Sequence, residues 1–403
     1  MGTVKERALR VFAADDSAVM RGIMHRLFRM HDEDRLSELP RMDLCGVARD
    51  GVECLEGVRR LGPDVLVLDL EMPRLGGLAV LDRLRVEQPG LPVIMCSAHT
   101  EHGARSTLEA LARGASDYVM KPSGQRDFEA ALLSLSQALL PRIAALAGGR
   151  RGGEEKNASD WMGVAQRPRT GEGHVPAAVE VVVIGLSTGG PAALEQLLPG
   201  LPADFPVPVM IVQHMPKLFT GALAERLNRC CALRVEEAYE GARIQPGVVW
   251  LAPGDAHMEV AARKAMPGDE SGGVDGRVRL HQRKPLNHCR PSVDYLFLSA
   301  AQMFGAGVLA LVMTGMGADG LEGARVVRER GGVVLAQDEA SSAVWGMPGR
   351  VKTAGIASET LPLAAIAEAL QQRVNAGRLR EPEVMRQGAA AMISRREVID
   401  GLL

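Results

Sequence analysis

The chain has 403 residues, of which 46% are hydrophobic, 24% are charged and 3% are aromatic, and its formal net charge at pH 7 is -2. This length predicts two or three compact domains, and the composition is that of a folded chain, which excludes a single small module and wholesale disorder. Acidic and basic residues nearly balance, so no basic field favours binding to nucleic acid or to an anionic membrane.

Short aliphatic runs alternate with helical segments over the first 138 residues. The runs are LRVFA, VLVLDL, PVIMC and DYVM, and the helical segments include SAVMRGIMHRLFRM and FEAALLSLSQALL. Such alternation indicates a parallel sheet with crossover helices. We therefore expect a doubly wound α/β domain over residues 8–138.

A composition shift at about Gly148 marks the end of this pattern. The stretch that follows is rich in Gly, Pro and charge and has no strand or helix periodicity, so residues 139–178 are predicted to form a flexible linker. Alternation then restarts with VEVVVIG, PVPVMIVQ, VVWLA, GVLALVMTG and VVLAQ. A second doubly wound parallel sheet is expected over 179–371, with a surface loop at 262–285 and a C-terminal tail at 372–403, neither of which is assigned a role.

Polar residues follow four predicted strands of the first domain. Asp15 and Asp16 follow the first strand, Asp69 lies near the end of VLVLDL, and Ser97 and Lys121 end two further strands. Ligands of open parallel sheets bind at the carboxyl ends of the strands, so these groups should meet at one edge. Three carboxylates suit Mg²⁺, and one of them can accept a phosphoryl group. Helix capping is the alternative for the first two acids, but it does not explain the other strand ends.

The motifs DDSAVMR, VLDLEMPRLGGL, MCSAHT and DYVMKP resemble the receiver domain of two-component response regulators, over roughly residues 8–138. The resemblance implies that Asp69 is phosphorylated, with Asp15, Asp16 and Asp69 as partners of Mg²⁺. The phosphoryl-sensing groups that it implies are Ser97, Tyr118 and Lys121. Residues 31–43 form a long connection for that family, away from the acidic edge.

In the second domain, Gly185-Leu186-Ser187-Thr188-Gly189 follows a strand and fits G-x-S-x-G. Small residues allow a strained turn that exposes the serine, and the next helix offers backbone N–H donors for a developing oxyanion. A phosphate-binding loop is the alternative, although the spacing is not G-x-G-x-x-G.

A serine nucleophile needs a base, and His214 follows the next strand, PVPVMIVQ. Asp319 follows GVLALVMTG and is available to orient an imidazole. His257 in APGDAHM is the main rival base, because it also follows a strand. The chain order Ser, His, Asp differs from the orders of common serine hydrolases.

Six motifs of this domain occur in order: IGLSTGGPAAL, VQHMPKLFT, LAPGDAHM, CRPSVDYLF, TGMGADGLEGA and AQDEASSAVWGMP. Together they resemble the catalytic domain of the chemotaxis protein-glutamate methylesterase family, CheB, and the preceding receiver completes that architecture. The resemblance implies hydrolysis of glutamate γ-methyl esters, and deamidation of glutamines, on chemoreceptors. Ser187 would be the nucleophile, His214 the base and then the acid, and Asp319 the orienting group. Thr188 and Met316 would line the wall that positions the ester and its oxyanion.

The resemblance to this family also implies that the unphosphorylated receiver covers the esterase cleft and that phosphorylation of Asp69 opens the cleft. The expected partners are methyl-accepting chemoreceptors as substrates and a chemotaxis histidine kinase as phosphodonor. Mg²⁺ is the expected cofactor of the receiver, and no cofactor is expected for the esterase.

The remaining sequence features bear on disulfide bonds, zinc sites and the cellular location of the protein. The six cysteines form no CxxC pair, which disfavours a disulfide framework or a zinc site. We find neither a secretory signal nor an apolar run of about 18 residues, so a cytoplasmic protein without membrane insertion is expected.

Three rival classes have their own signatures. A DNA-binding regulator would carry a basic helix-turn-helix after the linker, where an aliphatic, strand-rich domain follows instead. An inactive esterase domain used for protein interaction would lack one residue of the Ser-His-Asp set. An oxidoreductase would bind a nicotinamide cofactor.

Overall fold

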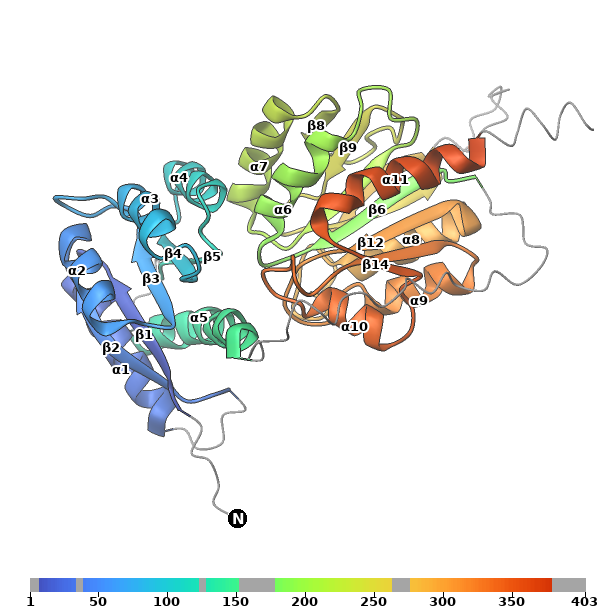
Figure 1. Ribbon diagram of the computed structural model, residues 1–403. Helices are drawn as coiled ribbons and strands as arrows, with labels where there is room; N and C mark the ends of the chain where they lie inside the picture. Colours follow the sequence, from blue (N-terminus) through green and yellow to red (C-terminus); the bar gives the residue numbers. More distant parts are fainter. Residues whose placement is uncertain (1–6, 34–38, 123–127, 152–177, 263–275, 379–403) are drawn as a thin grey trace, which may run out of the picture.

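The computed structural model describes residues 7–33, 39–122, 128–151, 178–262 and 276–378, which form two α/β domains (Figure 1). The elements of the first domain are β1 (Leu9–Ala14), α1 (Ala18–Glu33), β2 (Met42–Ala48), α2 (Gly51–Leu61), β3 (Val65–Asp69), α3 (Gly77–Glu87), β4 (Val93–Ser97), α4 (Glu101–Ala112), β5 (Asp117–Met120) and α5 (Phe128–Arg151). The strands form one parallel sheet in the order β2-β1-β3-β4-β5, which is flavodoxin-like.

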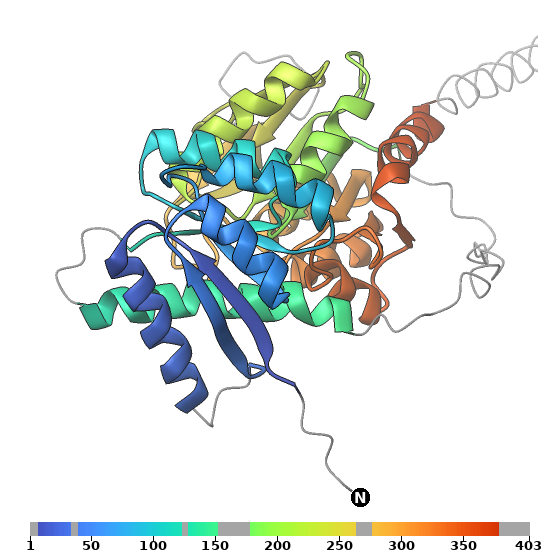
Figure 2. The same cartoon turned by 60° about the vertical axis from the view of Figure 1, so that its left-hand side comes forward.

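Helices cover both faces of this sheet, which explains why β3 and β4 are buried along their whole length. Residues of α1 and α5 pack on one face, where Leu132, Leu135 and Leu139 of α5 recur at helical spacing. Residues of α2, α3 and α4 pack on the other face. Figure 2 shows α5 lying along the sheet.

Part of α5 is also apolar enough to be tested as a membrane helix. Within the described residues, the segment Phe128–Ala147 has the length and composition for one span. Its buried leucines pack on the receiver sheet, and core helices of folded domains pass the same test.

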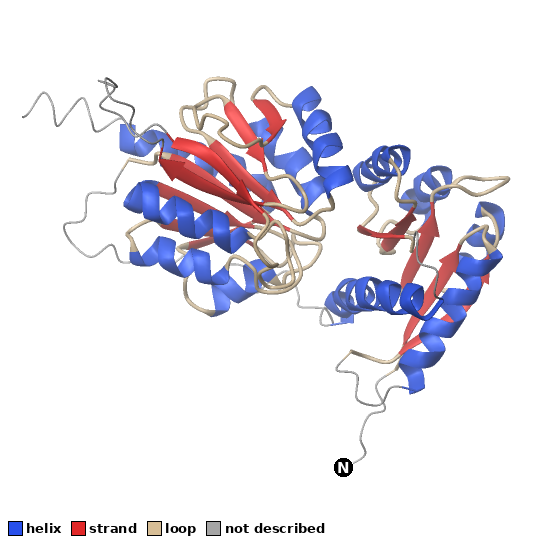
Figure 3. Cartoon of the chain, turned by 180° about the vertical axis from the view of Figure 1, so that it is seen from behind, coloured by secondary structure: helices blue, strands red, loops and turns tan. Residues whose placement is uncertain are grey.

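The second domain contains a seven-stranded sheet in the order β14-β13-β12-β6-β7-β9-β8, in which every pair is parallel. Its elements are β6 (Val181–Leu186), α6 (Gly190–Leu197), η1 (Leu198–Gly200), β7 (Val209–Gln213), α7 (Lys217–Cys230), β8 (Arg234–Glu237), β9 (Val248–Leu251), β10 (His257–Ala262), β11 (Gly276–His281), α8 (Val293–Phe304), η2 (Gly305–Gly307), β12 (Val308–Val312), α9 (Leu321–Glu329), β13 (Val333–Gln337), α10 (Met347–Thr353), β14 (Glu359–Leu361) and α11 (Leu363–Arg378). Helices flank both faces, as Figure 3 shows. The predicted fold class, two doubly wound parallel-sheet domains, is confirmed.

The structure differs from the predicted boundaries in three places. Helix α5 continues to Arg151, so the predicted linker does not begin at residue 139, and the remainder at 152–177 lies outside the described residues. Residues 276–281 are a strand paired antiparallel with β10 rather than a loop, because Val278 and Leu280 alternate with arginines and pack inward. Helix α11 reaches Arg378, beyond the predicted start of the tail, and residues 379–403 are not described.

The two domains contact each other through α4, which packs against α6 and α7. Tyr118 at the end of the receiver sheet stacks on Phe219 of α7, with ring centroids 4.7 Å apart. Both rings belong to one continuous cluster of buried side chains that spans the two domains. The receiver therefore lies against the edge of the second domain where β6 and β7 end.

Candidate active site and phosphorylation site

The strand order places the three predicted catalytic residues at one edge of the second sheet. Ser187 follows β6, His214 follows β7 and Asp319 lies beyond β12, and these strands are neighbours in the order β12-β6-β7. The chain reverses its direction of progress across the sheet beside β6, and such a switch point is where open α/β sheets bind ligands. The predicted convergence of these residues is therefore what the topology produces.

The backbone around Ser187 is tightly constrained. Its N–H donates to the carbonyl of Thr314 at 3.0 Å, and Gln213 Nε2 donates to its carbonyl at 2.9 Å. Gly189 adopts φ 80°, which favours glycine, and a Cβ on Gly185 would lie 2.3 Å from Cγ1 of Val293. The glycines of the G-x-S-x-G turn thus meet steric needs, as predicted for an exposed serine.

Asp319 is buried and accepts hydrogen bonds on both carboxylate oxygens. Oδ2 accepts from the His214 ring nitrogen Nε2 and from the Val293 N–H, each at 2.7 Å. Oδ1 accepts from Ser292 Oγ at 2.8 Å and from Asn287 Nδ2 at 3.1 Å. Burial alone would raise the pKa of Asp319, but its hydrogen bonds and the His214 charge hold it well below the usual range.

His214 is held between two partners. Nε2 faces Asp319, and Nδ1 lies 3.5 Å from the sulfur of Cys289. Burial alone would lower the pKa of His214, but hydrogen bonding to Asp319 and Cys289 outweighs it and raises the pKa to about 9. Among the described contacts, Ser187 Oγ makes no hydrogen bond with His214, so proton transfer between them requires a movement that brings the two side chains within hydrogen-bond distance.

His257, the rival base, has a different environment. It is fully buried, its Nδ1 accepts from the Ser292 N–H at 3.2 Å, and its Nε2 faces the Lys284 carbonyl at 3.3 Å. Burial and the nearby charge of His281 lower its pKa. Both ring nitrogens are thus occupied by backbone groups, and the side chain supports Ser292 rather than Ser187.

Thr188 and Met316, the two predicted wall residues, lie at the contact with the receiver. Thr188 Oγ1 donates to Asp117 Oδ2 at 2.7 Å, although the residues are 71 positions apart and belong to different domains. Asp117 also accepts from Arg142 of α5 at 3.1 Å. Met316 packs against the receiver core cluster, together with the buried Val344. A residue adjacent to Ser187 is therefore bonded directly to the receiver.

The predicted phosphorylation site gathers at the carboxyl edge of the receiver sheet. Carboxylate oxygens of Asp15, Asp16 and Asp69 lie within 4.8 Å of one another. Lys121 Nζ donates to Asp69 Oδ2 at 2.6 Å and lies 2.9 Å from Asp15 Oδ2. Burial, opposed by the Lys121 hydrogen bond and reinforced by the Asp15 charge, raises the pKa of Asp69 to about 6.

The two other predicted sensing residues do not contact Asp69 through hydrogen bonds in the described structure. Ser97 Oγ accepts from Thr107 at 2.7 Å and donates to the Gly103 carbonyl at 3.2 Å, so it bonds to the first turns of α4. Tyr118 is buried against Phe219 of the second domain. These two residues connect the carboxyl edge of the receiver sheet to α4 and α7, which form the domain contact.

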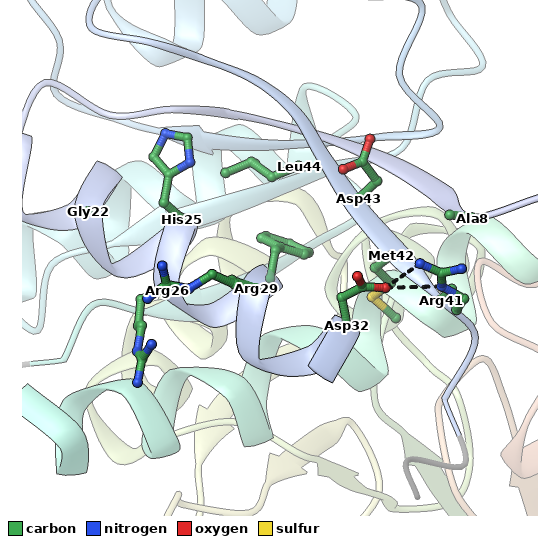
Figure 4. A pocket seen from close by; sticks show the side chains of 11 residues that line it. Ala8, Gly22, His25, Arg26, Arg29, Asp32, Arg41, Met42, Asp43 and Leu44 are labelled. Atoms are coloured by element: carbon green, nitrogen blue, oxygen red, sulfur yellow. Dashed lines mark hydrogen bonds and ion pairs between the residues drawn. The ribbon is translucent and has the colours of Figure 1, made fainter. Parts of the chain in front are cut away.

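Two hollows of about 660 Å³ each lie elsewhere. One lies between α1 and β2 and is lined by His25, Arg26, Arg29 and the Arg41–Asp32 ion pair (Figure 4). The other lies between α4 and α7. Neither is lined by a predicted catalytic or phosphorylation residue.

Several residues of the site were not predicted. Asn287, Ser292 and Cys289 surround the Asp319–His214 pair, and Asp117 bonds to Thr188. Ser292 and Cys289 lie in the motif CRPSVDYLF, which supported the family resemblance but predicted no role for either residue. The signal that could have indicated them is their position just before α8, whose N-terminus packs beside Asp319.

The fold and these two sites define a class of protein, a receiver domain joined to an α/β domain with a Ser-His-Asp set. Residues 11–133 match the response regulator receiver domain family, and residues 182–370 match the CheB methylesterase family. A protein-glutamate methylesterase/protein-glutamine glutaminase of Trichodesmium erythraeum is 41% identical over 91% of this chain and 99% of its own length. A protein of the same name from Nocardioides is 43% identical over 91% of this chain and 95% of its own. The chain belongs to this CheB family of protein-glutamate methylesterases.

The chain is also similar to a solved structure. The catalytic domain of Thermotoga maritima CheB methylesterase is 40% identical, covering 49% of this chain and 99% of that one, with a TM-score of 0.45.

Proposed function

We propose that this protein hydrolyses glutamate γ-methyl esters on chemoreceptors, and deamidates receptor glutamines, under control of phosphorylation at Asp69. The observation that carries the proposal is the convergence of Ser187, His214 and Asp319 at the ends of three adjacent strands, with a 2.7 Å bond between the last two. The printed names of the relatives supply the substrate class.

In this proposal Ser187 Oγ attacks the ester carbonyl and transfers its proton to His214. Asp319 holds the ring through Nε2 and stabilises the imidazolium. The tetrahedral intermediate collapses when His214 returns the proton to the methoxy oxygen, which releases methanol. Water then attacks the acyl-enzyme, with His214 again as base, and regenerates Ser187 and a glutamate carboxylate. A glutamine substrate would release ammonia by the same steps.

The three receiver carboxylates fit Mg²⁺. Their oxygens lie within 4.8 Å of one another with the single ammonium of Lys121 beside them, and burial together with the neighbouring acids raises the pKa of Asp69. A divalent cation that prefers oxygen ligands would neutralise the repulsion among the three carboxylates, so we assign Asp15, Asp16 and Asp69 as the ligands of Mg²⁺. When bound, Mg²⁺ would offset the charge of the incoming phosphoryl group. Lys121 would hold a phosphoryl oxygen on Asp69.

The domain contact supplies the regulation. The Thr188–Asp117 bond and the Tyr118–Phe219 stack hold the receiver against the residue that follows the nucleophile. Phosphorylation would weaken this docked state and expose the ester site. Moving such an equilibrium from 1:99 to 99:1 requires about 5.5 kcal/mol of differential stabilisation.

Stimulation of the methylesterase rate by a phosphodonor is expected to require both Asp69 and Mg²⁺. In Asp69→Asn, a small acyl phosphate should leave the methylesterase rate at its unstimulated level, because the acceptor carboxylate is absent. Chelation of Mg²⁺ in the wild type should do the same. The measurement is methanol release with and without the donor, and normal stimulation of Asp69→Asn would refute the assignment.

Loosening the domain contact should activate the enzyme without phosphorylation. Asp117→Asn removes a charged acceptor from Thr188, and the loss of a charge-assisted bond of about 1.5–3 kcal/mol corresponds to a rise in unstimulated rate of about 10- to 150-fold. Asp82→Asn is the matched control, since Asp82 pairs with Arg113 inside the receiver. Equal rates in the two variants would show that this contact does not restrain the enzyme.

We also propose a cytoplasmic location, because the apolar helix α5 is occupied in the receiver core. Chemoreceptor cytoplasmic regions as substrates and a histidine kinase as phosphodonor are consistent with that location.

A further inference from the structure

Cys289 lies inside the proposed active site, yet the hydrolytic mechanism does not use it. Its sulfur is 3.5 Å from His214 Nδ1 and 3.3 Å from the carbonyl of Asn287, and the side chain is partly exposed. A tight turn places the side chain there. Leu286 and Cys289 pair in an antiparallel β-bridge, and the two residues between them, Asn287 and His288, adopt φ 52° and 62°.

The separation of these two atoms matches a metal site. In tetrahedral zinc centres the Zn–N distance is about 2.0–2.1 Å and the Zn–S distance about 2.3 Å, which places the two ligand atoms about 3.5 Å apart. The sulfur and Nδ1 of this structure have that spacing. The soft thiolate and the imidazole are also the ligands that favour zinc over magnesium.

The other side of the His214 ring is arranged as in a metal-bound histidine. Metal-binding imidazoles usually donate their second N–H to a carboxylate that is itself fixed by hydrogen bonds. Here Nε2 donates to Asp319, which Ser292 and Asn287 hold in turn. A carboxylate oxygen of Asp319, a ring nitrogen of His214 and the sulfur of Cys289 also lie within 4.8 Å of one another.

We propose that Cys289 Sγ and His214 Nδ1 form a binding site for Zn²⁺ that blocks ester hydrolysis. Binding releases the thiol proton, and the Nδ1 proton of the imidazolium, to solvent, and leaves a zinc-bound thiolate and a neutral imidazole that keeps its Nε2 proton. It fixes the ring between Cys289 and Asp319, so that neither nitrogen can receive the proton of Ser187. The inhibitory effect rests on the proposed function of His214, whereas the binding itself does not.

Other groups in the chain could also bind zinc and must be separated from this site. The sulfurs of Cys230 and Cys231 lie 3.9 Å apart at the end of α7, and the three receiver carboxylates form a second group. The double substitution of Cys230 and Cys231 by serine controls for the first, and Asp16→Asn for the second.

Inhibition is measured as the unstimulated methylesterase rate against free Zn²⁺, in excess Mg²⁺, with each variant compared with its own zinc-free rate. The wild type and both controls should lose activity by at least about tenfold at saturating zinc and recover it on chelation, because metal binding through a thiolate is reversible. Cys289→Ser and Cys289→Ala should lose less than about twofold, since one imidazole alone holds zinc weakly. Equal inhibition of wild type and Cys289 variants would overturn the proposal.

Cobalt provides a readout that does not depend on activity. Co²⁺ added to Ser187→Ala protein that also carries Cys230→Ser and Cys231→Ser should give a thiolate-to-cobalt charge-transfer band, and the band should disappear when Cys289→Ala is added. Absence of the band in folded Ser187→Ala protein would refute the metal site while leaving the hydrolytic proposal intact. Retention of hydrolysis by Ser187→Ala would instead refute the proposed function, whatever cobalt shows.

Discussion

Replacing Ser187 with alanine is expected to lower the methylesterase turnover by a factor on the order of 10⁶, the cost of removing the nucleophile from a Ser-His-Asp set. The reason is that no acyl-enzyme can form and water must attack the ester without covalent assistance. The fold should be unaffected, because Ser187 Oγ makes no hydrogen bond with the described residues and only its backbone bonds to Thr314 and Gln213.

The control for this variant is Ser341→Ala, which removes a hydroxyl from the same domain that bonds Asp338 and Gln337 rather than His214. Turnover should change little in the control. If Ser187→Ala kept more than a small fraction of the wild-type rate, the nucleophile would have to be another group.

Replacing Asp319 with asparagine should lower turnover by about 10⁴, because an amide neither holds the productive tautomer of His214 nor stabilises the imidazolium. The variant should also change the pH profile. The Asp319 hydrogen bond helps to raise the pKa of His214 to about 9, so in the wild type the active, neutral imidazole accumulates as pH rises toward that value. Without the negative charge the pKa falls, and the rising limb of kcat/KM should move to lower pH.

The two effects separate a catalytic from a structural role. A variant that merely unfolded would lose turnover without a shift in the rising limb of kcat/KM, whereas we expect both changes in Asp319→Asn. Rates are taken from pH 5 to 10 with Ser187→Ala as the blank for hydroxide-driven hydrolysis. If the rising limb of the kcat/KM profile stayed at the wild-type pH in a folded Asp319→Asn enzyme, the assignment of His214 and Asp319 as a catalytic pair would be wrong.

The sheet edges were the most predictable part of the protein. Aliphatic runs located the strands, and parallel strands bring their carboxyl ends together, so Asp15, Asp69 and Lys121 could be grouped from the sequence alone. The same logic joined His214 and Asp319, which lie 105 residues apart.

Contacts made by loops and between domains were not predictable in this way. The Thr188–Asp117 bond depends on how two domains dock, which strand periodicity does not encode. Cys289 reaches His214 through a turn with two left-handed residues, and no metal-ligand spacing in the sequence marks it. The β11 strand was missed because its alternation follows a Gly-rich stretch and contains charged residues.

The central claim, a methylesterase held in check by its own receiver, is tested most directly by methanol release from a methylated chemoreceptor before and after addition of a small acyl phosphate. We expect slow release that accelerates on addition of the donor in the wild type, and almost none in Ser187→Ala under either condition. Absence of methanol from the wild type with donor and Mg²⁺ present, or equal release by the two proteins, would contradict it.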